Sequence, residues 1–568
     1  MSENAIASSL EPAAVPLRPP EQVMRLARLG SFHQSRLSFL RVLLRRIDRE
    51  RWRFQRRRFD VDAKGVGAAL YTIEVGGRTY TLVAFAHDLA PDKRTDRVIA
   101  TEWDATFALF DGIPADEEMA RLRENVPRQE GGRYLQSELV LARANRSVRL
   151  FDSVVAALAA GRQPDETALR ATGYLMRTTA VYANGKFGIA DRDVYAGRDE
   201  MAGPFQAEML TVWLIRSFTV DLVEHLARLR NPHSAVRLDR PLRRRLGVGN
   251  ATGLGMAPFL VKHPALIHRW IVARETALAR VRSACEASYH ELHALRGLVQ
   301  AALEMHAGWT TDDPVQAPRI AQLRSDLVRF REEVGRWRDQ CGRRAPGVWN
   351  ALYVWAEQHL CLEAQEQVVS LLLETFPRLV DDLAATMAID EQMEFAVDGR
   401  MRCDALRAAV DQHYAWTRAV DFAQPAANAK FWYVSEEKLE PRLGERHTEP
   451  GAELEQPLTI ARDVVALRSA LGATTADTTV GRFLMQRPEH RHTVRRVQTS
   501  MRNPYAEIRD NLISAELRAI DLLRCKLSFF GCTRFDPRSD KWLRITLYQG
   551  APFPDEIGCG DWDQWIWD

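Results

Sequence analysis

Residues 70–84 read LYTIEVGGRTYTLVA. Two runs rich in β-branched and aromatic residues flank Gly76-Gly77, a pair that suits the positive φ angles of a two-residue turn. The pattern predicts a β-hairpin. Two further short strands are expected near 98–101 and 106–110, and together with the hairpin they predict a small antiparallel sheet.

The residues before the hairpin have helical periodicity. Apolar residues between 23 and 59 recur at spacings of three and four, with arginines between them. We expect one or two amphipathic helices that pack on the small sheet and form an N-terminal α+β domain over residues 21–113. Residues 1–20 contain four prolines and no periodic pattern, which predicts a mobile tail.

The middle of the chain predicts helices. We expect a helical domain over residues 114–423, with glycine-bearing loops at 183–204 and 244–264. Apolar residues near heptad spacing predict one very long helix over 265–306, and a long loop is expected over 424–456.

The end of the chain, residues 457–568, predicts further helices and two short strands, near 527–535 and 542–548. One of these helices is expected to start at Pro504 behind an Asn503 N-cap and to end near Cys525. The predicted fold class is therefore mainly α, a large helical domain with very long helices, plus a small antiparallel β element near the N-terminus and the two C-terminal strands.

Composition places the chain among ordinary folded proteins. Of 568 residues, 46% are hydrophobic and 27% charged, and the net charge of +3 gives no global attraction to nucleic acid or anionic membranes. The seven cysteines never form a C-x-x-C pair, which is typical of reduced thiols. Neither a signal-peptide layout nor a run of about 18 apolar residues is present, so we expect a cytoplasmic protein without a membrane partner.

The first candidate site follows Arg177. Asn184-Gly185 and Gly188 predict a tight turn that exposes backbone amides to an anion, and Lys186 stands inside it. Lysine is scarce here, with 8 lysines against 70 arginines, and its tunable pKa suits a catalytic base or an anion holder. The alternative is an ordinary connecting loop with a solvated lysine.

The second candidate site is GVGNATGLGMAP, residues 247–258, followed by Lys262 and His263. Four glycines in nine residues are costly to order, so they indicate a close backbone approach to a ligand or to a neighbouring helix. Asn250 and Thr252 offer uncharged hydrogen-bonding groups, while Lys262 and His263 offer charge or a proton relay.

The third candidate site is a late polar group around Arg502 and Tyr505, which are predicted to flank a helix N-terminus and to orient an anionic substrate. The alternative is that Asn503 simply caps that helix.

Several familiar site types are excluded by spacing. The glycines lack the preceding buried strand of a dinucleotide fingerprint, and neither the P-loop nor the H-E-x-x-H pattern is present. The polar residues Glu286, His290, Glu291 and His293 are interpreted as a solvated stripe, so no metal ligands are predicted and any cofactor is unknown.

The function that these features favour is a metabolic enzyme acting on a small polar, anionic substrate by proton transfer of the lyase or isomerase type. Lys186 or His263 is the expected catalytic base. The expected substrate-binding residues are Arg177, Asn184, Asn250, Thr252, Lys262, Arg502 and Tyr505. The hypothesis requires the two glycine-bearing segments to converge in space.

Two alternatives remain open. Residues 25–58 hold twelve arginines against Asp48 and Glu50, a composition that also fits a nucleic-acid-binding or regulatory adaptor, although nucleic acid is the less favoured partner. The other alternative is a non-catalytic helical oligomer, since very long helices suit a homo-oligomer.

Overall fold

The structure is a computed structural model. It describes residues 15–90, 93, 102–125, 135–183, 197–253, 264–284, 286–309, 311, 313–340, 345–388, 396–424, 430–433, 442–444, 454–457, 460–509, 524, 526–536, 542–558 and 562–567.

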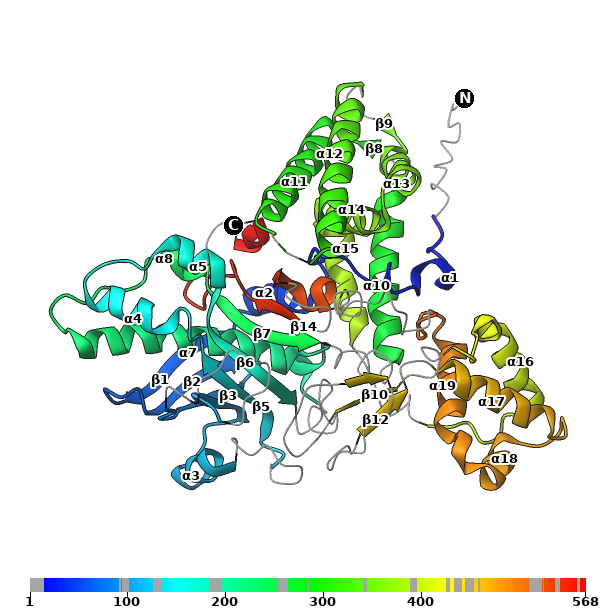
Figure 1. Cartoon of the computed structure of the whole chain (residues 1–568), viewed down its shortest axis with the longest axis horizontal. Helices are drawn as coiled ribbons and strands as arrows, with labels where there is room; N and C mark the ends of the chain where they lie inside the picture. The colour runs from blue at the N-terminus through cyan, green and yellow to red at the C-terminus, as the bar shows by residue number, and fades with distance from the viewer. Residues whose placement is uncertain are drawn as a thin grey trace, which may run out of the picture.

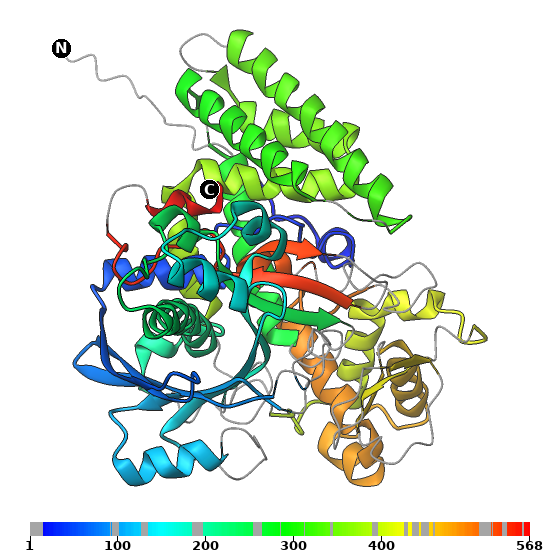
Figure 2. The ribbon, with the colours of Figure 1, turned by 60° about the vertical axis from the view of Figure 1, so that its left-hand side comes forward.

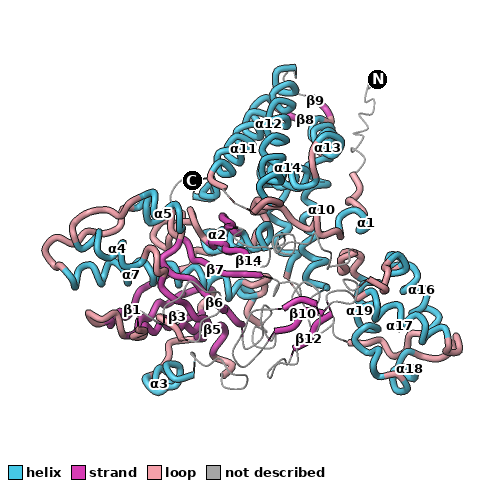
Figure 3. Tube along the Cα trace, in the orientation of Figure 1, coloured by secondary structure: helices cyan, strands magenta, loops and turns pink. Residues whose placement is uncertain are grey.

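A mixed sheet of nine strands forms the centre of the molecule (Figure 1, Figure 3). In spatial order its strands are β1 (Arg53–Val61), β2 (Gly67–Val75), β3 (Arg78–Ala86), β4 (Ala105–Asp111), β5 (Glu138–Arg146), β6 (Tyr174–Ala183), β7 (Gly247–Gly253), β14 (Trp542–Leu547) and β13 (Cys532–Asp536). Neighbouring strands are antiparallel except β6 and β7, which are parallel.

The predicted hairpin is confirmed. Strands β2 and β3 pair antiparallel up to Val75 and Arg78, and the connecting Gly76 and Gly77 have φ angles of 57° and 79°. Positive φ at both central residues is the requirement of a type I′ turn, which only glycine meets without strain. The strand expected near 106–110 is also present, as β4. The strand expected near 98–101 lies outside the described residues.

The predicted fold class is wrong, because the sheet is large. Strands β5 and β6 lie where helices were expected, and β7 occupies part of a predicted loop. The strand predicted near 542–548 is present as β14, whereas the one predicted near 527–535 is a π-helix up to Gly531 and a strand, β13, only over Cys532–Asp536. Both strands extend this same sheet through β7 instead of standing apart. Every residue of β5 is buried, so the strand lacks the alternation that identifies a half-buried strand in sequence.

Helices cover both faces of the sheet. Helix α7 (Gln206–Arg230) lies across one face, where the Tyr71 hydroxyl of β2 donates a hydrogen bond of 2.7 Å to Asp221. Helix α3 (Asp116–Asn125) packs on the other face, against Leu70 and Val83. Around α7 lie α2 (Phe39–Arg49), α4 (Phe151–Ala159), α5 (Glu166–Thr172) and α8 (Arg240–Arg244).

A helical lobe stands on the sheet domain, as Figure 2 shows. It contains α10 (Pro264–Arg282), α11 (Tyr289–Ala307), α12 (Gln316–Gln340), α13 (Val348–His359), α14 (Leu362–Thr375), α15 (Pro377–Val380) and the 3-10 helix η3 (Asp381–Met387), with the short strands β8 (Glu286–Ala287) and β9 (Ala345–Pro346). The single long helix predicted over 265–306 is wrong. It divides into α10 and α11, because Ser288 and Glu291 form a capping box that starts a new helix.

The C-terminal helices build a separate small core. It comprises α16 (Cys403–His413), α17 (Ala461–Gly472), α18 (Val480–Gln486) and α19 (Arg491–Arg502), with the 3-10 helices η4 (Ala415–Ala419) and η6 (Pro488–His490). The short strands β10 (Lys430–Tyr433), β11 (Arg442–Gly444) and β12 (Leu454–Pro457) form a second sheet. The remaining elements are α1 (Pro20–Val23), the 3-10 helices η2 (Asp199–Met201) and η8 (Trp562–Trp567), and the π-helix η7 (Lys526–Gly531).

Asn503 does not cap a helix N-terminus. It is the C-cap of α19, with its side-chain amide donating to the Thr499 carbonyl at 3.0 Å, and residues 503–509 form turns. Most of the helix predicted to follow, residues 510–523, lies outside the described chain.

Among the described residues, the longest helices are too polar to cross a lipid bilayer, and none combines the length and apolar character that a membrane span needs.

Candidate functional site

The carboxyl ends of β6 and β7 lie side by side. The two strands pair in parallel, with Arg177 opposite Gly249 and Thr178 opposite Asn250. Strand β6 leads into the first glycine-bearing segment and then into α7, while β7 leads into the second segment and then into α10. Because parallel strands end at the same edge of a sheet, both segments begin at one edge, which is the usual ligand-binding edge of sheets with parallel βαβ units.

Two of the predicted substrate-binding residues lie in these neighbouring strands. Arg177 is buried in β6, and the Asn250 side chain donates a hydrogen bond of 3.0 Å to the Thr178 hydroxyl of the neighbouring strand. Thr252 lies opposite Leu543 of β14. The remaining predicted residues of these two segments, Asn184, Lys186, Lys262 and His263, lie outside the described residues.

The two residues of the third predicted site, Arg502 and Tyr505, lie in different surroundings. The Tyr505 backbone amide donates to Nδ1 of His268 in α10 at 3.2 Å, so Tyr505 lies beside the helix that follows Lys262 and His263. Its hydroxyl donates to the Arg18 carbonyl at 2.7 Å, a bond that a substrate would have to replace. Arg502 instead lines a separate cavity of about 560 Å³ near α19.

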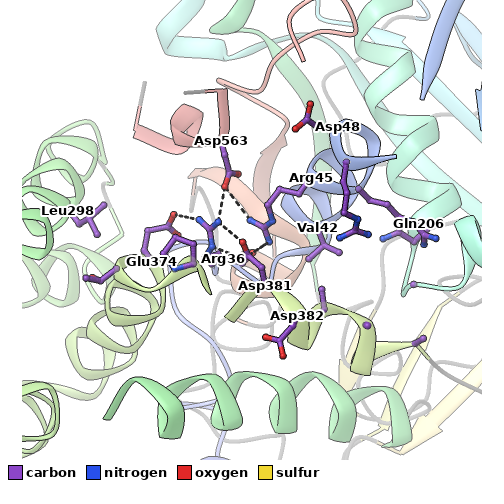
Figure 4. A pocket seen from close by; sticks show the side chains of 18 of the residues that line it. Arg36, Val42, Arg45, Asp48, Gln206, Leu298, Glu374, Asp381, Asp382 and Asp563 are labelled. Atoms are coloured by element: carbon purple, nitrogen blue, oxygen red, sulfur yellow. Dashed lines mark hydrogen bonds and ion pairs between the residues drawn. The ribbon is translucent and has the colours of Figure 1, made fainter. Parts of the chain in front are cut away.

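A groove of about 1250 Å³ lies at the N-terminal end of α7 (Figure 4). Helices α2, α11 and α14 and the 3-10 helix η3 form its walls, and the tail helix η8 contributes Asp563. The described end of the first polar segment also lines it, through Asp199, Ala202 and Gly203. The groove therefore lies beside the chain that connects β6 to α7.

Arginines of the α2 region form ion pairs across this groove. Arg36 binds both carboxylate oxygens of Asp381, at 2.7 and 2.8 Å. Arg41 binds both oxygens of Glu374, at 2.6 and 2.7 Å. Two-point pairing of this kind fixes the orientation as well as the position of each guanidinium.

Arg45 and Asp563 are held less tightly than these pairs. The nearest carboxylate oxygens to the Arg45 guanidinium belong to Asp381 and Asp563, and both lie 3.6 Å away. Its Nη2 donates to the Arg36 carbonyl at 2.7 Å, whereas Nη1 has no hydrogen-bond acceptor in the described part of the chain. Asp563 lies 3.1 Å from Arg36 and 3.5 Å from Arg41.

The electrostatics of the groove follow from this arrangement. Burial opposes ionisation of Glu374, but the charges and hydrogen bonds of Arg41, Arg36 and Arg45 outweigh it and lower the pKa to about 2. Burial lowers the pKa of Arg45 to about 10, and repulsion by Arg41 and Arg36 adds to the effect. Arg45 remains charged at neutral pH, with less compensation from carboxylates than its neighbours have.

Gln206 supplies a neutral polar group at the start of α7. Its side chain is 2% exposed and lines the groove, and its Oε1 has no donor among the described residues. The preceding residue, Phe205, has a φ of 56° and provides no side-chain cap, so the first turn of a 25-residue helix opens without one.

The opposite wall is apolar. Helix α11 contributes Ala294, Gly297, Leu298 and Ala301, and η3 adds Ala384 and Ala385. The groove thus combines a charged side with a side of small apolar residues and one leucine, an arrangement suited to an anion that carries an apolar body.

Sequence reasoning missed this groove. It interpreted the arginines of residues 25–58 as packing or nucleic-acid residues, whereas Arg36 and Asp381 pair across 345 positions of the chain. The only local signal is the i, i+4 spacing of Arg41 and Arg45, which places both on one helix face.

The described residues contain no group of three or more histidine, cysteine or carboxylate side chains placed to hold a metal ion. No family model, no curated protein and no solved structure matches this chain.

Proposed function

We propose that this chain is a metabolic enzyme that acts on a small polar, anionic substrate by proton transfer of the lyase or isomerase type. The observation that supports the proposal is the parallel pairing of β6 and β7, which starts both glycine-bearing segments at one edge of the sheet. The groove at the start of α7 places charged groups nearby, with four arginines and six carboxylates among its lining residues.

The proposed catalytic base is Lys186 or His263, one from each segment. A histidine titrates near neutral pH, and burial lowers the pKa of a lysine, so either group suits proton abstraction. Backbone amides of the glycine-bearing turns would then add hydrogen bonds to the substrate.

A ligand screen tests the proposal. Thermal unfolding of the full chain is followed with panels of carboxylates, phosphates and sulfonates, because a ligand of the folded state raises the melting temperature. We expect Lys186→Met to reduce the shift that a binding compound gives, without lowering the melting temperature of the free protein. The matched control is Lys93→Met, which removes an exposed lysine paired with Glu102 at 2.5 Å. If Lys186→Met lowers basal stability and leaves the ligand response intact, the segment is a packing element and the proposal is wrong.

Nucleic-acid binding is the second candidate, and one observation favours it. The edge strand β1 presents exposed arginines at positions 53, 56, 57 and 58. Charged residues on an edge strand also prevent edge-to-edge association, so salt dependence must separate the two roles. Phosphate contacts by these four arginines would give oligonucleotide affinity that falls steeply with salt, and a flat dependence rules them out.

A further inference from the structure

On the charged side of the groove, the Asp563 carboxylate is bound less closely by arginine than the other carboxylates are. Arg36 and Arg41 each donate two hydrogen bonds of 2.6 to 2.8 Å to one carboxylate. The carboxylate of Asp563 is shared among Arg36, Arg41 and Arg45 at 3.1, 3.5 and 3.6 Å. The guanidinium groups of Arg36 and Arg45 therefore converge on one carboxylate without forming a close two-point pair to it, as Figure 4 shows. Arg41 lies 3.5 Å from the same carboxylate, but it is fully buried and does not line the groove.

Asp563 is accessible as well as loosely held. Its side chain is 24% exposed, and it belongs to the short tail helix η8, not to the helices that carry the arginines. An oxyanion that entered the groove would find the guanidinium groups of Arg36 and Arg45 and would compete with this carboxylate. Charge-assisted bonds to arginine are strongest when they are short and two-pronged, which the present distances are not.

The apolar wall leads away from this charged position. At Gly297 of α11, no described atom lies within 4 Å of the place where a Cβ would stand, so the wall is open there. The groove volume of about 1250 Å³ exceeds what a bare phosphate or acetate ion requires. Buried Gln206 adds a hydrogen-bonding group at the α7 side of the groove.

We infer that the groove binds an amphipathic organic anion, with its oxyanion head at Arg36 and Arg45 in place of the Asp563 carboxylate and its apolar body along α11. The shared chemistry is the oxyanion head, and either a phosphate monoester or a carboxylate provides it. The inference rests on the proposed function, because it names the substrate class, but it places binding in described residues that are distinct from Lys186 and His263.

Binding of simple probes tests the head and the body separately. Isothermal titration of the full chain compares hexyl phosphate, hexanoate, inorganic phosphate and hexanol. We expect the two hexyl anions to bind, and we expect the phosphate ion and the alcohol to bind at least about tenfold more weakly, because each lacks one half of the interaction. The stronger of the two hexyl anions identifies the head group. Equal binding of hexanol and hexyl phosphate would overturn the inference.

Two substitutions at the charged end have opposite expected effects. Arg45→Gln should weaken binding of the hexyl anions by about tenfold or more, while Arg51→Gln, just after the same helix and outside the groove, with a side chain 82% exposed, should leave it unchanged. Asp563→Asn removes the competing charge and should strengthen binding severalfold. A purely structural ion cluster gives no gain from Asp563→Asn, and that result contradicts the inference even if Arg45→Gln fails to fold.

The apolar end is tested by filling it. Gly297→Phe should abolish binding of both hexyl anions and leave the weak binding of inorganic phosphate in place. Gly335→Phe is the matched control, since Gly335 lies in α12 and does not line the groove. Unchanged hexyl phosphate binding in Gly297→Phe rejects the proposed path of the body.

The two proposals fail in different ways. In one outcome, Arg45→Gln and Gly297→Phe no longer bind the hexyl anions, while Lys186→Met and His263→Gln still bind them and keep the thermal shift given by the compound from the ligand screen. The groove site then stands, and the proposed catalytic base is wrong. If the lysine variant loses binding while the two groove variants keep it, the site at the sheet edge stands and the groove inference is wrong.

Discussion

Two buried histidines, His33 and His306, make the stability of the folded chain depend on acidity. Burial is the main cause in both: it lowers the pKa of His33 from 6.5 to about 4 and that of His306 from 6.5 to about 3. Both rings are therefore neutral in the folded protein at neutral pH, whereas the unfolded chain binds protons at these sites near pH 6.5.

This difference predicts acid destabilisation. The stability that the neutral rings contribute is complete above pH 6.5 and is lost as pH falls from 6.5 toward 4, at about 1.4 kcal/mol per pH unit for each histidine. Urea unfolding between pH 7.5 and 4.5 measures it. We expect His306→Gln to make the loss with falling pH shallower, and His293→Gln, which changes an exposed ring, to leave it as in the wild type. Parallel profiles for all three proteins would refute the assignment.

Asn250 allows a direct choice between a binding role and a structural role. Its hydrogen bond to Thr178 joins β6 to β7 in the stretch where the two strands pair in parallel. Because one hydrogen bond contributes about 1 kcal/mol, Asn250→Ala should lower the free energy of unfolding by that amount. The ligand-induced shift in melting temperature should persist if this bond is the residue's main role. Loss of the shift at unchanged stability would instead make Asn250 a substrate-binding residue.

At the scale of elements, strand β7 explains the glycines that sequence analysis assigned to a loop. A Cβ at Gly247 would overlap the Leu547 carbonyl of β14, and one at Gly249 would lie 2.7 Å from the Tyr174 ring. Glycine within a strand marks such close approaches. Gly247 and Gly249 therefore serve packing between strands, while Gly255 lies outside the described chain.

This packing predicts different stability changes for three glycine-to-alanine substitutions. Gly247→Ala should lower the free energy of unfolding by about 1 to 3 kcal/mol, since backbone atoms of β14 must move. Gly249→Ala should cost less, because the ring of the Tyr174 side chain has to shift instead of backbone atoms. Gly297→Ala in α11 should raise stability by about 0.5 to 1 kcal/mol, since its Cβ enters open space and alanine favours helix. Chemical denaturation of the three variants checks the order.

At the scale of the whole molecule, the N-terminal segment connects parts of the chain that lie far apart in sequence. Arg18 is buried and donates to Glu275 of α10 at 2.7 and 2.8 Å and to Glu366 of α14 at 2.8 Å. Its carbonyl accepts the Tyr505 hydroxyl, beyond α19. One residue thus contacts the helical lobe and the C-terminal region at once.

Removal of this arginine should be costly. Arg18→Met leaves Glu275 and Glu366 buried with fewer positive partners, and breaking a buried ion pair costs about 3 to 5 kcal/mol. Adding Glu275→Gln to Arg18→Met should recover part of that loss, because it removes one of the uncompensated charges. Thermal unfolding of the single and double variants measures the recovery, and strictly additive losses would contradict the coupling.

The sequence by itself determined the features that depend on neighbouring residues. The β2–β3 hairpin followed from alternating strand residues around Gly76-Gly77, since the turn and its register are local. Strands β4 and β14 were also predictable, from short β-rich runs, whereas the strand predicted over 527–535 begins as a π-helix. Arg177 and Asn250 lie in the neighbouring strands β6 and β7, and their substrate-binding role stays a prediction.

Tertiary structure alone decided the rest. Strand β5 is buried along its whole length, including its polar residues Glu138, Arg143, Asn145 and Arg146, so it does not alternate between buried apolar and exposed polar residues as a half-buried strand does. The groove residues Arg36, Glu374, Asp381 and Asp563 acquire their role only when α2, η3 and η8 meet. Ion pairing depends on distance in space, and a pair 345 residues apart leaves no pattern in the sequence around either partner.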